Sequence, residues 1–127
     1  MKGITRCVAL VAAFFVVTLA FDRAEADYVI LGAGTHSCGA WTKEHANDSV
    51  RANIFDNWVA GYITSHNRWA LRIEKVDAPK KSVDIARNID FDGIVAWITN
   101  WCRDNPLESV ADATGALILE LRKRKGW

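Results

Sequence analysis

The sequence predicts a small all-α domain of four helices, held by one disulfide and preceded by a cleaved signal peptide. Three observations support this prediction. Apolar residues recur at spacings of three and four along most of the chain beyond residue 37, and this periodicity is typical of amphipathic helices. Two cysteines, Cys38 and Cys102, lie far apart in that part of the chain, while the first 26 residues have the layout of a leader.

The first 26 residues carry charged, apolar and small side chains in the order that an export signal needs. Lys2 and Arg6 provide the positive start, the apolar run extends from Cys7 to Phe21, and Ala24-Glu25-Ala26 forms the cleavage site. An uncut membrane anchor is the alternative, but the 15 residues of this run are fewer than the roughly 20 that a membrane span needs. We therefore expect removal of residues 1–26 and a periplasmic or secreted protein.

Residues 27–127 form the exported chain, which is long enough for one small domain and too short for two. Its 13 Lys and Arg balance its 13 Asp and Glu, and a neutral surface argues against nucleic acid, which selects basic faces. The basic cluster from Arg122 to Lys125 fits the C-terminal turn of a helix, where cations are favourable. No other segment is long and apolar enough to span a membrane. The expected partners are proteins, with a homodimer left open.

Two helices are predicted in the first half of this domain. A short helix covers Ser37 to Ala46 and stops at Asn47-Asp48, and a longer helix covers Ser49 to about Arg68. The longer helix aligns six apolar residues on one face: Ile54, Phe55, Trp58, Val59, Tyr62 and Ile63.

The stretch from Ala70 to Asn88 gives conflicting signals. Leu71, Ile73 and Val76 alternate as a short strand would, whereas Pro79 and the lysines after it indicate a loop. Both alternatives stay open at this point.

Two further helices are predicted in the second half. The first begins in the Asp90 to Asp92 segment, stops at Asn105-Pro106, and carries an apolar stripe: Ile94, Ile98, Trp101 and Cys102. For the second, Asn105 can cap, Pro106 fits the first helical position, and Glu108 stands three residues beyond the cap, where its side chain can reach back. This last helix is expected to end near Gly126 and to bury one face: Leu107, Val110, Ala111, Thr114, Ile118 and Leu121.

Only Cys38 and Cys102 remain after the leader is removed, and two thiols in an oxidising compartment favour a disulfide. The bond would join the first predicted helix to the third and close a loop of roughly 65 residues, a stabilisation of about 4 kcal/mol on chain-entropy grounds. That is comparable with the net stability of a small domain. The alternative makes Cys38 a metal ligand with His36 and His45, but this spacing matches no established set and leaves Cys102 without a role. We expect no metal and no other cofactor.

Three local strings resemble catalytic or ligand-binding motifs but lack the context of such motifs. Tyr28 to Gly34 ends in Gly-x-Gly, but Ser37 stands at the third glycine position and no βαβ unit follows, so we expect an extended lead-in and a flexible turn. Ser65-His66 lies in mid-helix without a nucleophile elbow, which favours a partly buried structural histidine. The string from Asp90 to Gly93 lacks the later glutamate of a calcium loop.

No catalytic cluster is visible in the linear sequence, and we predict that the protein is not an enzyme. Asp56, His66 and Asp112 would be candidates only if the fold brought them together. Core packing is the ordinary role of aromatic residues on helical stripes, yet this many large rings can also form a binding groove. The predicted partner-binding residues are Trp41, Trp58, Tyr62, Trp97 and Trp101.

Three short motifs resemble a known family. They are Cys38-x-x-Trp41, then Trp58-x-x-Gly61-Tyr62 on a long helix, then Trp101-Cys102-Arg103-x-Asn105-Pro106 ahead of an amphipathic helix. Together they are similar to the small periplasmic acid-stress chaperones of the HdeA/HdeB type, over most of the mature domain. This resemblance implies a four-helix periplasmic fold with one disulfide, and a chaperone that exposes apolar surface at low pH.

A second resemblance rests on the step Gly61-Tyr62-Ile63 with the same cysteine and helix plan. It looks like the immunity proteins that block type VI secretion amidases, although that family usually carries more cysteines. It implies an inhibitor that binds a secreted cell-wall amidase or another toxin. A structural periplasmic protein is the third hypothesis.

Acid would change the charge of this domain strongly. Its 13 basic side chains and three histidines reach a total of +16 once every carboxylate is neutral, whereas the charge is near zero at neutral pH. Such self-repulsion loosens a compact fold or dimer and exposes the tryptophan-rich stripes, while the charge keeps complexes soluble. The long segment between Arg68 and Asn88 and the six tryptophans are departures from the chaperone family.

Overall fold

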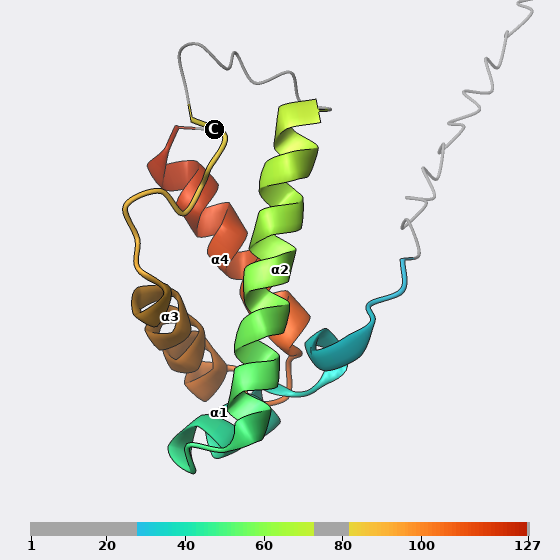
Figure 1. The fold of residues 1–127 in the computed structure, drawn as a ribbon. Coiled ribbons are helices and arrows are strands. Elements are labelled where there is room, and N and C mark those ends of the chain that lie inside the picture. The colour runs from blue at the N-terminus through green and yellow to red at the C-terminus, as the bar shows by residue number, and fades with distance from the viewer. Residues whose placement is uncertain (1–27, 73–81, 127) are drawn as a thin grey trace, which may run out of the picture.

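The computed structural model describes residues 28–72 and 82–126, which form four α-helices and no strand. In chain order the elements are the 3-10 turn η1 (Gly32–Thr35) and the helices α1 (Cys38–Ala46), α2 (Val50–Arg72), α3 (Phe91–Asp104) and α4 (Val110–Arg124). Figure 1 shows α2 along the length of the molecule, with α3 and α4 beside it and α1 across the end where α2 begins. The all-α prediction of four helices is confirmed.

The predicted leader, residues 1–26, lies outside the described residues. Within residues 28–72 and 82–126, no helix is both long enough and apolar enough to cross a bilayer.

Polar caps set most helix boundaries where the sequence predicts them. The Ser37 side chain accepts a hydrogen bond from the amide of Ala40 at the start of α1, and Asp90 accepts one from the amide of Gly93 at the start of α3. Such side-chain oxygens replace the intrahelical partners that the first amides lack. α1 ends at Ala46 as expected, with Asn47 as its C-cap and Asp48 at a positive φ of 47°.

The second helix is longer than its predicted range. Ser49 accepts a hydrogen bond from the amide of Ala52, and α2 continues to Arg72, past the predicted end near Arg68. Leu71 is therefore helical, and neither the strand nor the loop alternative holds at that residue; Ile73 and Val76 lie outside the described residues.

The predicted start of the last helix is wrong. Asn105 is the C-cap of α3, and α4 begins at Val110 after a capping box in which Ser109 and Asp112 exchange hydrogen bonds. Leu107, predicted to be buried, is 95% exposed. The reason is tertiary. The carbonyls of Pro106 and Glu108 accept hydrogen bonds from the amides of Gly39 and Cys38, which holds this segment against α1 and outside the helix.

The core lies where the four helices face one another. Its large buried side chains include most of those predicted from periodicity: Phe55, Val59, Ile63, Ile94, Ile98, Val110, Ile118 and Leu121. Ile54 is the exception on α2, because it points outward and is 57% exposed. The buried Thr114 hydroxyl donates to the carbonyl of Val110, one turn earlier, so this buried polar side chain has a hydrogen-bond partner.

The predicted disulfide is confirmed. Cys38 and Cys102 are bonded, 64 positions apart in the sequence, and both are fully buried. Because the Cys38 sulfur is used in this bond, the alternative arrangement with His36 and His45 as metal ligands is excluded. The neighbouring bridge between Ser37 and Ser109 brings the start of α4 to the same place. The disulfide end of the molecule thus joins α1, α3 and α4.

The segment before α3 is a loop in its described part, residues 82–90, as one of the two alternatives predicted. Asn67 of α2 holds it, because its side chain donates to Asp84 and accepts from the amide of Ile85. Ile85 is buried in the core, and Lys125 donates to the carbonyl of Asp84. These contacts fix the loop between α2 and the end of α4.

Candidate functional site

Trp41 is a core residue and not a surface residue. Its ring is fully buried, stacks on the rings of His45 and Phe55 at centroid distances of 4.0 and 5.9 Å, and donates from Nε1 to Thr99 Oγ1 at 2.9 Å. Trp41 is therefore part of the core in the folded protein, and its role in partner binding stays a prediction. The inward face of the short helix α1 offers few side chains. The large ring of Trp41 fills the space between this face and the helices α2 and α3.

The other predicted partner-binding residues fall into two groups. Trp97 and Trp101 lie half-buried on α3, beside the core cluster. Trp58 and Tyr62 lie one turn apart on α2, where their rings stack at a centroid distance of 5.1 Å. The fold therefore distributes the predicted set over three helices and does not collect it into one site.

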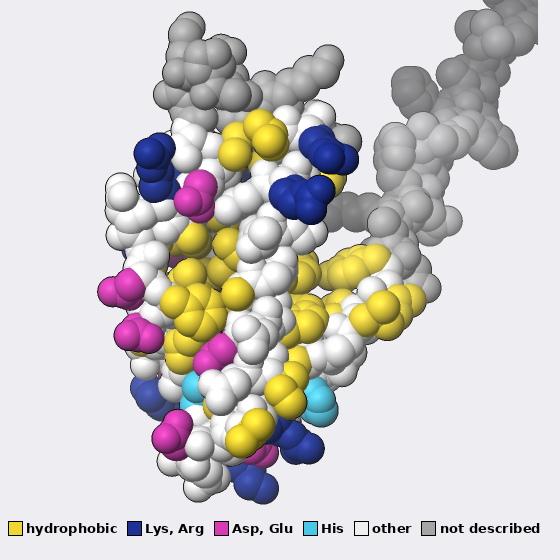
Figure 2. Space-filling model, in the orientation of Figure 1, with side chains coloured by type: hydrophobic (Ala, Val, Ile, Leu, Met, Phe, Trp, Pro, Cys, Tyr) yellow, Lys and Arg dark blue, Asp and Glu magenta, His cyan; other side chains and the backbone are white. Residues whose placement is uncertain are grey.

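A groove lies between α2 and the segment that precedes η1. It has a volume of about 430 Å³ and is lined by Tyr28, Val29, Ile30, Leu31, Asn57, Trp58, Gly61 and Tyr62; we call it the aromatic groove. Figure 2 shows hydrophobic side chains gathered between α2 and this N-terminal segment. Three neighbouring wall residues, Tyr28, Val29 and Leu31, are 70%, 81% and 76% exposed, and contiguous exposed apolar surface is typical of binding sites.

The glycines of the Gly-x-Gly string have a structural reason. Gly32 has a positive φ of 72°, and a Cβ atom on Gly34 would stand 2.1 Å from the ring of Trp58. The indole Nε1 of Trp58 also donates to the carbonyl of Leu31 at 2.8 Å. The string that resembles a dinucleotide-binding turn thus packs against the ring of Trp58. At the place where the sequence predicts a flexible turn, the structure has the 3-10 turn η1. The wall formed by residues 28–31 was not predicted, although its apolar run was a visible signal.

Tyr62 stays neutral over a wide pH range. Burial raises the pKa of Tyr62 above its ordinary value of 10.0, and the nearby Tyr28 and the negative charge of Asp112 raise it further. At neutral pH the groove is therefore uncharged at this position.

A second feature is the contact between α1 and α2, which we call the α1–α2 junction and define by Glu44, His45, Ser49, Arg51 and Asp56. His45 Nδ1 lies 2.9 Å from the carbonyl oxygen of Trp41, and Nε2 lies 2.9 Å from Asp56 Oδ1. Both partners are acceptors, so a protonated ring can donate to both at once while a neutral ring can donate to only one. The contact between His45 and Asp56 is an ion pair when the ring is protonated, and the two side chains are 15% and 24% exposed.

Glu44 adds a second carboxylate to the α1–α2 junction. Its Oε2 accepts from the Ser49 hydroxyl at 2.6 Å, and its Oε1 lies 3.7 Å from the guanidinium of Arg51. Two acidic side chains therefore connect α1 with α2, and neither the sequence spacing nor a known motif predicted this pairing.

The three residues considered for catalysis have separate structural partners. Asp56 pairs with His45, and Asp112 belongs to the capping box of α4. His66 is half-buried on α2, as predicted, with its ring 6.4 Å from that of Trp69.

No family model, curated protein or solved structure matches this chain. The function has to be inferred from geometry and residue chemistry.

Proposed function

We propose that this protein is an exported chaperone that holds other polypeptides under acid stress, the activity that its resemblance to the HdeA/HdeB type implies. The observation that carries the proposal is the α1–α2 junction. Two carboxylates, Asp56 and Glu44, make its contacts, and the ring of His45 stacks on that of Trp41, which stacks in turn on that of Phe55.

Acid would weaken this junction from both helices. Protonation of Asp56 removes the negative partner of His45, and protonation of Glu44 removes the attraction to Arg51. A half-buried charge left without its counter-charge is unfavourable, and the rising positive charge of the whole domain adds self-repulsion. The disulfide keeps α1 and α3 together, so α2 is the helix that separates. Its inner face then becomes available to client chains.

The buried disulfide supports the proposed location. Disulfides form and persist in secreted proteins and in the periplasm, and they are rare in the cytosol. Together with the predicted leader, the Cys38–Cys102 bond favours an exported protein.

The decisive experiment compares client protection with exposure of apolar surface as the pH falls. We expect the oxidised protein to suppress light scattering by an acid-labile client enzyme near pH 2 to 3, and to bind a hydrophobic dye in the same range. A variant with Asp56→Asn and Glu44→Gln carries permanently neutral side chains at the junction, so its dye binding should begin at a higher pH.

Glu120→Gln is the matched control, since Glu120 is an exposed carboxylate that pairs with Arg124 within α4, outside the junction. It should leave the transition almost unchanged. Native near-UV circular dichroism at pH 2 without client protection would contradict the proposed function.

A further inference from the structure

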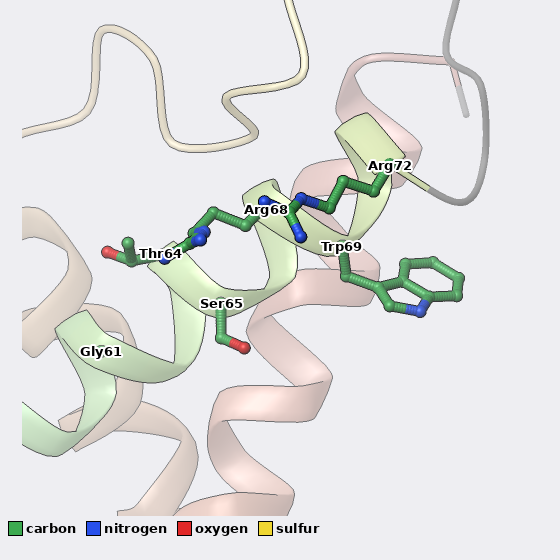
Figure 3. A pocket seen from close by; sticks show the side chains of 6 residues that line it. All are labelled: Gly61, Thr64, Ser65, Arg68, Trp69 and Arg72. Atoms are coloured by element: carbon green, nitrogen blue, oxygen red, sulfur yellow. The ribbon is translucent and has the colours of Figure 1, made fainter.

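A second hollow lies on the outward face of α2, towards its C-terminal end. It has a volume of about 440 Å³ and is lined by Gly61, Thr64, Ser65, Arg68, Trp69 and Arg72; we call it the arginine hollow. In Figure 3 the side chain of Arg72 is directed towards Arg68, and that of Arg68 towards Thr64, while Ser65 and Trp69 lie on the other side. Figure 2 shows Lys and Arg side chains over this end of α2.

Several residues of the arginine hollow are energetically unfavourable in the protein without a partner. Arg68 and Arg72 are one turn apart, and like charges at this spacing repel. The ion pairs found among the described residues involve other cations, so neither arginine has an acidic partner there. Trp69 is 49% exposed, although a ring of this size ordinarily loses water on folding.

Gly61 is a further unfavourable residue, and it connects the two hollows. Glycine in the middle of a helix is destabilising relative to alanine. A Cβ atom on Gly61 would meet nothing within 4 Å, so the packing of this chain does not require a glycine. Gly61 lines both the arginine hollow and the aromatic groove. The backbone of α2 is therefore uncovered at the point where the apolar and the cationic surfaces meet.

We propose that the outward face of α2, from Trp58 to Arg72, is a docking surface for a segment of another protein that carries apolar side chains next to acidic ones. The apolar side chains enter the aromatic groove, the carboxylates pair with Arg68 and Arg72, and the backbone of the segment crosses at Gly61. Arginine suits this role because its planar guanidinium binds carboxylates through two parallel hydrogen bonds. The surface extends over about 21 Å of helix, which corresponds to about 14 helical residues of a partner.

This docking surface goes beyond the proposed chaperone activity, because it belongs to the folded protein at neutral pH. Its test is therefore separate from the acid experiment, and either can fail alone. The probes are two synthetic peptides of about 14 residues, each with a leucine- and phenylalanine-rich half. One peptide has a glutamate- and aspartate-rich second half, and the other has lysine at those positions.

Titration at pH 7 and low salt, followed by tryptophan fluorescence, should show saturable binding of the acidic peptide and about tenfold weaker binding of the lysine peptide. The double variant Arg68→Glu, Arg72→Glu should reverse this preference. Lys123→Glu removes an exposed cation of α4 that lines neither hollow, so it should leave the preference unchanged.

Gly61→Ala gives a second, independent readout. It should raise the thermal midpoint, because alanine favours the helix, and yet weaken binding of the acidic peptide, because a methyl group then covers the crossing point. Gly115→Ala is the matched control in α4, where a Cβ atom also meets nothing within 4 Å; it should raise the midpoint without a change in binding.

Several results would overturn the proposal. Equal affinity for the two peptides, an unchanged preference in the arginine variant, or no saturable binding of the acidic peptide would each do so. Self-association of the free protein at pH 7 that the arginine variant abolishes would show that a second copy occupies the surface, and would also overturn it.

Discussion

The two ends of α1 are held by different kinds of bond. At its start, the buried Cys38–Cys102 disulfide and the backbone hydrogen bonds to Pro106 and Glu108 join α1 to α3 and to the start of α4. At its end, α1 meets α2 through side chains, two of which are carboxylates. The first set of contacts includes a covalent bond, whereas the second consists of side-chain contacts that include two carboxylates. We call the disulfide end the permanent end of the fold.

The largest effect is expected at the permanent end. Replacement of Cys38 and Cys102 by serine removes a constraint on a loop of 64 positions, which the chain-entropy model values at about 4 kcal/mol. The free energy of unfolding, measured by urea denaturation at pH 7, should fall by about that amount. Reduction of the native protein with dithiothreitol should have the same effect, and a loss below about 1 kcal/mol would show that the bond is not the main constraint.

A smaller effect is expected at the α1–α2 junction. Asp56→Asn removes the charge of a half-buried hydrogen-bonded pair, and such a pair contributes about 2 kcal/mol. At pH 7 the variant should lose about that much stability. Urea denaturation of the variant and of the native protein at pH 7 measures this difference, and an unchanged midpoint would contradict the role of this pair at the junction.

The prediction of the helices from the sequence succeeded because local chemistry decides most of them. Periodicity and the polar caps Ser37 and Asp90 fixed the first turn of α1 and of α3. The prediction failed at Asn105 to Glu108. There a local pattern typical of a helix start is overridden by hydrogen bonds to Cys38 and Gly39, nearly 70 residues away. A cap that the sequence offers is used only where the rest of the chain leaves the segment free.

The candidate sites were harder to predict than the helices. Trp58 and Tyr62 were named as partner-binding residues, but their groove needs a wall from Tyr28 to Leu31, which precedes α1 in the chain. Periodicity describes which face of a helix is apolar, and it does not say which distant segment will cover that face. The same holds for His45 and Asp56, whose contact depends on how the turn between α1 and α2 folds back.

The corrected start of α4 gives a third prediction, which concerns the permanent end alone. Ser109→Ala removes the capping box and should cost about 1 kcal/mol. Asn105→Ala removes only one side-chain hydrogen bond to the carbonyl of Trp101 at the end of α3, so its cost should be smaller. Thermal unfolding of the two variants at pH 7 compares them directly. A larger loss for Asn105→Ala would favour the helix start that the sequence alone suggested.

The smallest predicted effect concerns the opposite side of α2, at high pH. Burial, with Tyr28 and Asp112 nearby, raises the pKa of Tyr62 above 10.0, so the unfolded chain ionises first as the pH rises. Below pH 10 this tyrosine is neutral in both states and adds no pH dependence. From pH 10 up to the raised pKa, ionisation favours the unfolded chain, and stability should fall. Tyr62→Phe should make the urea midpoint less sensitive to a change from pH 9 to pH 11, whereas Tyr28→Phe, which removes an exposed hydroxyl, should alter that sensitivity less. If Tyr62→Phe left the alkaline loss unchanged, the groove side of α2 would not contribute to that loss.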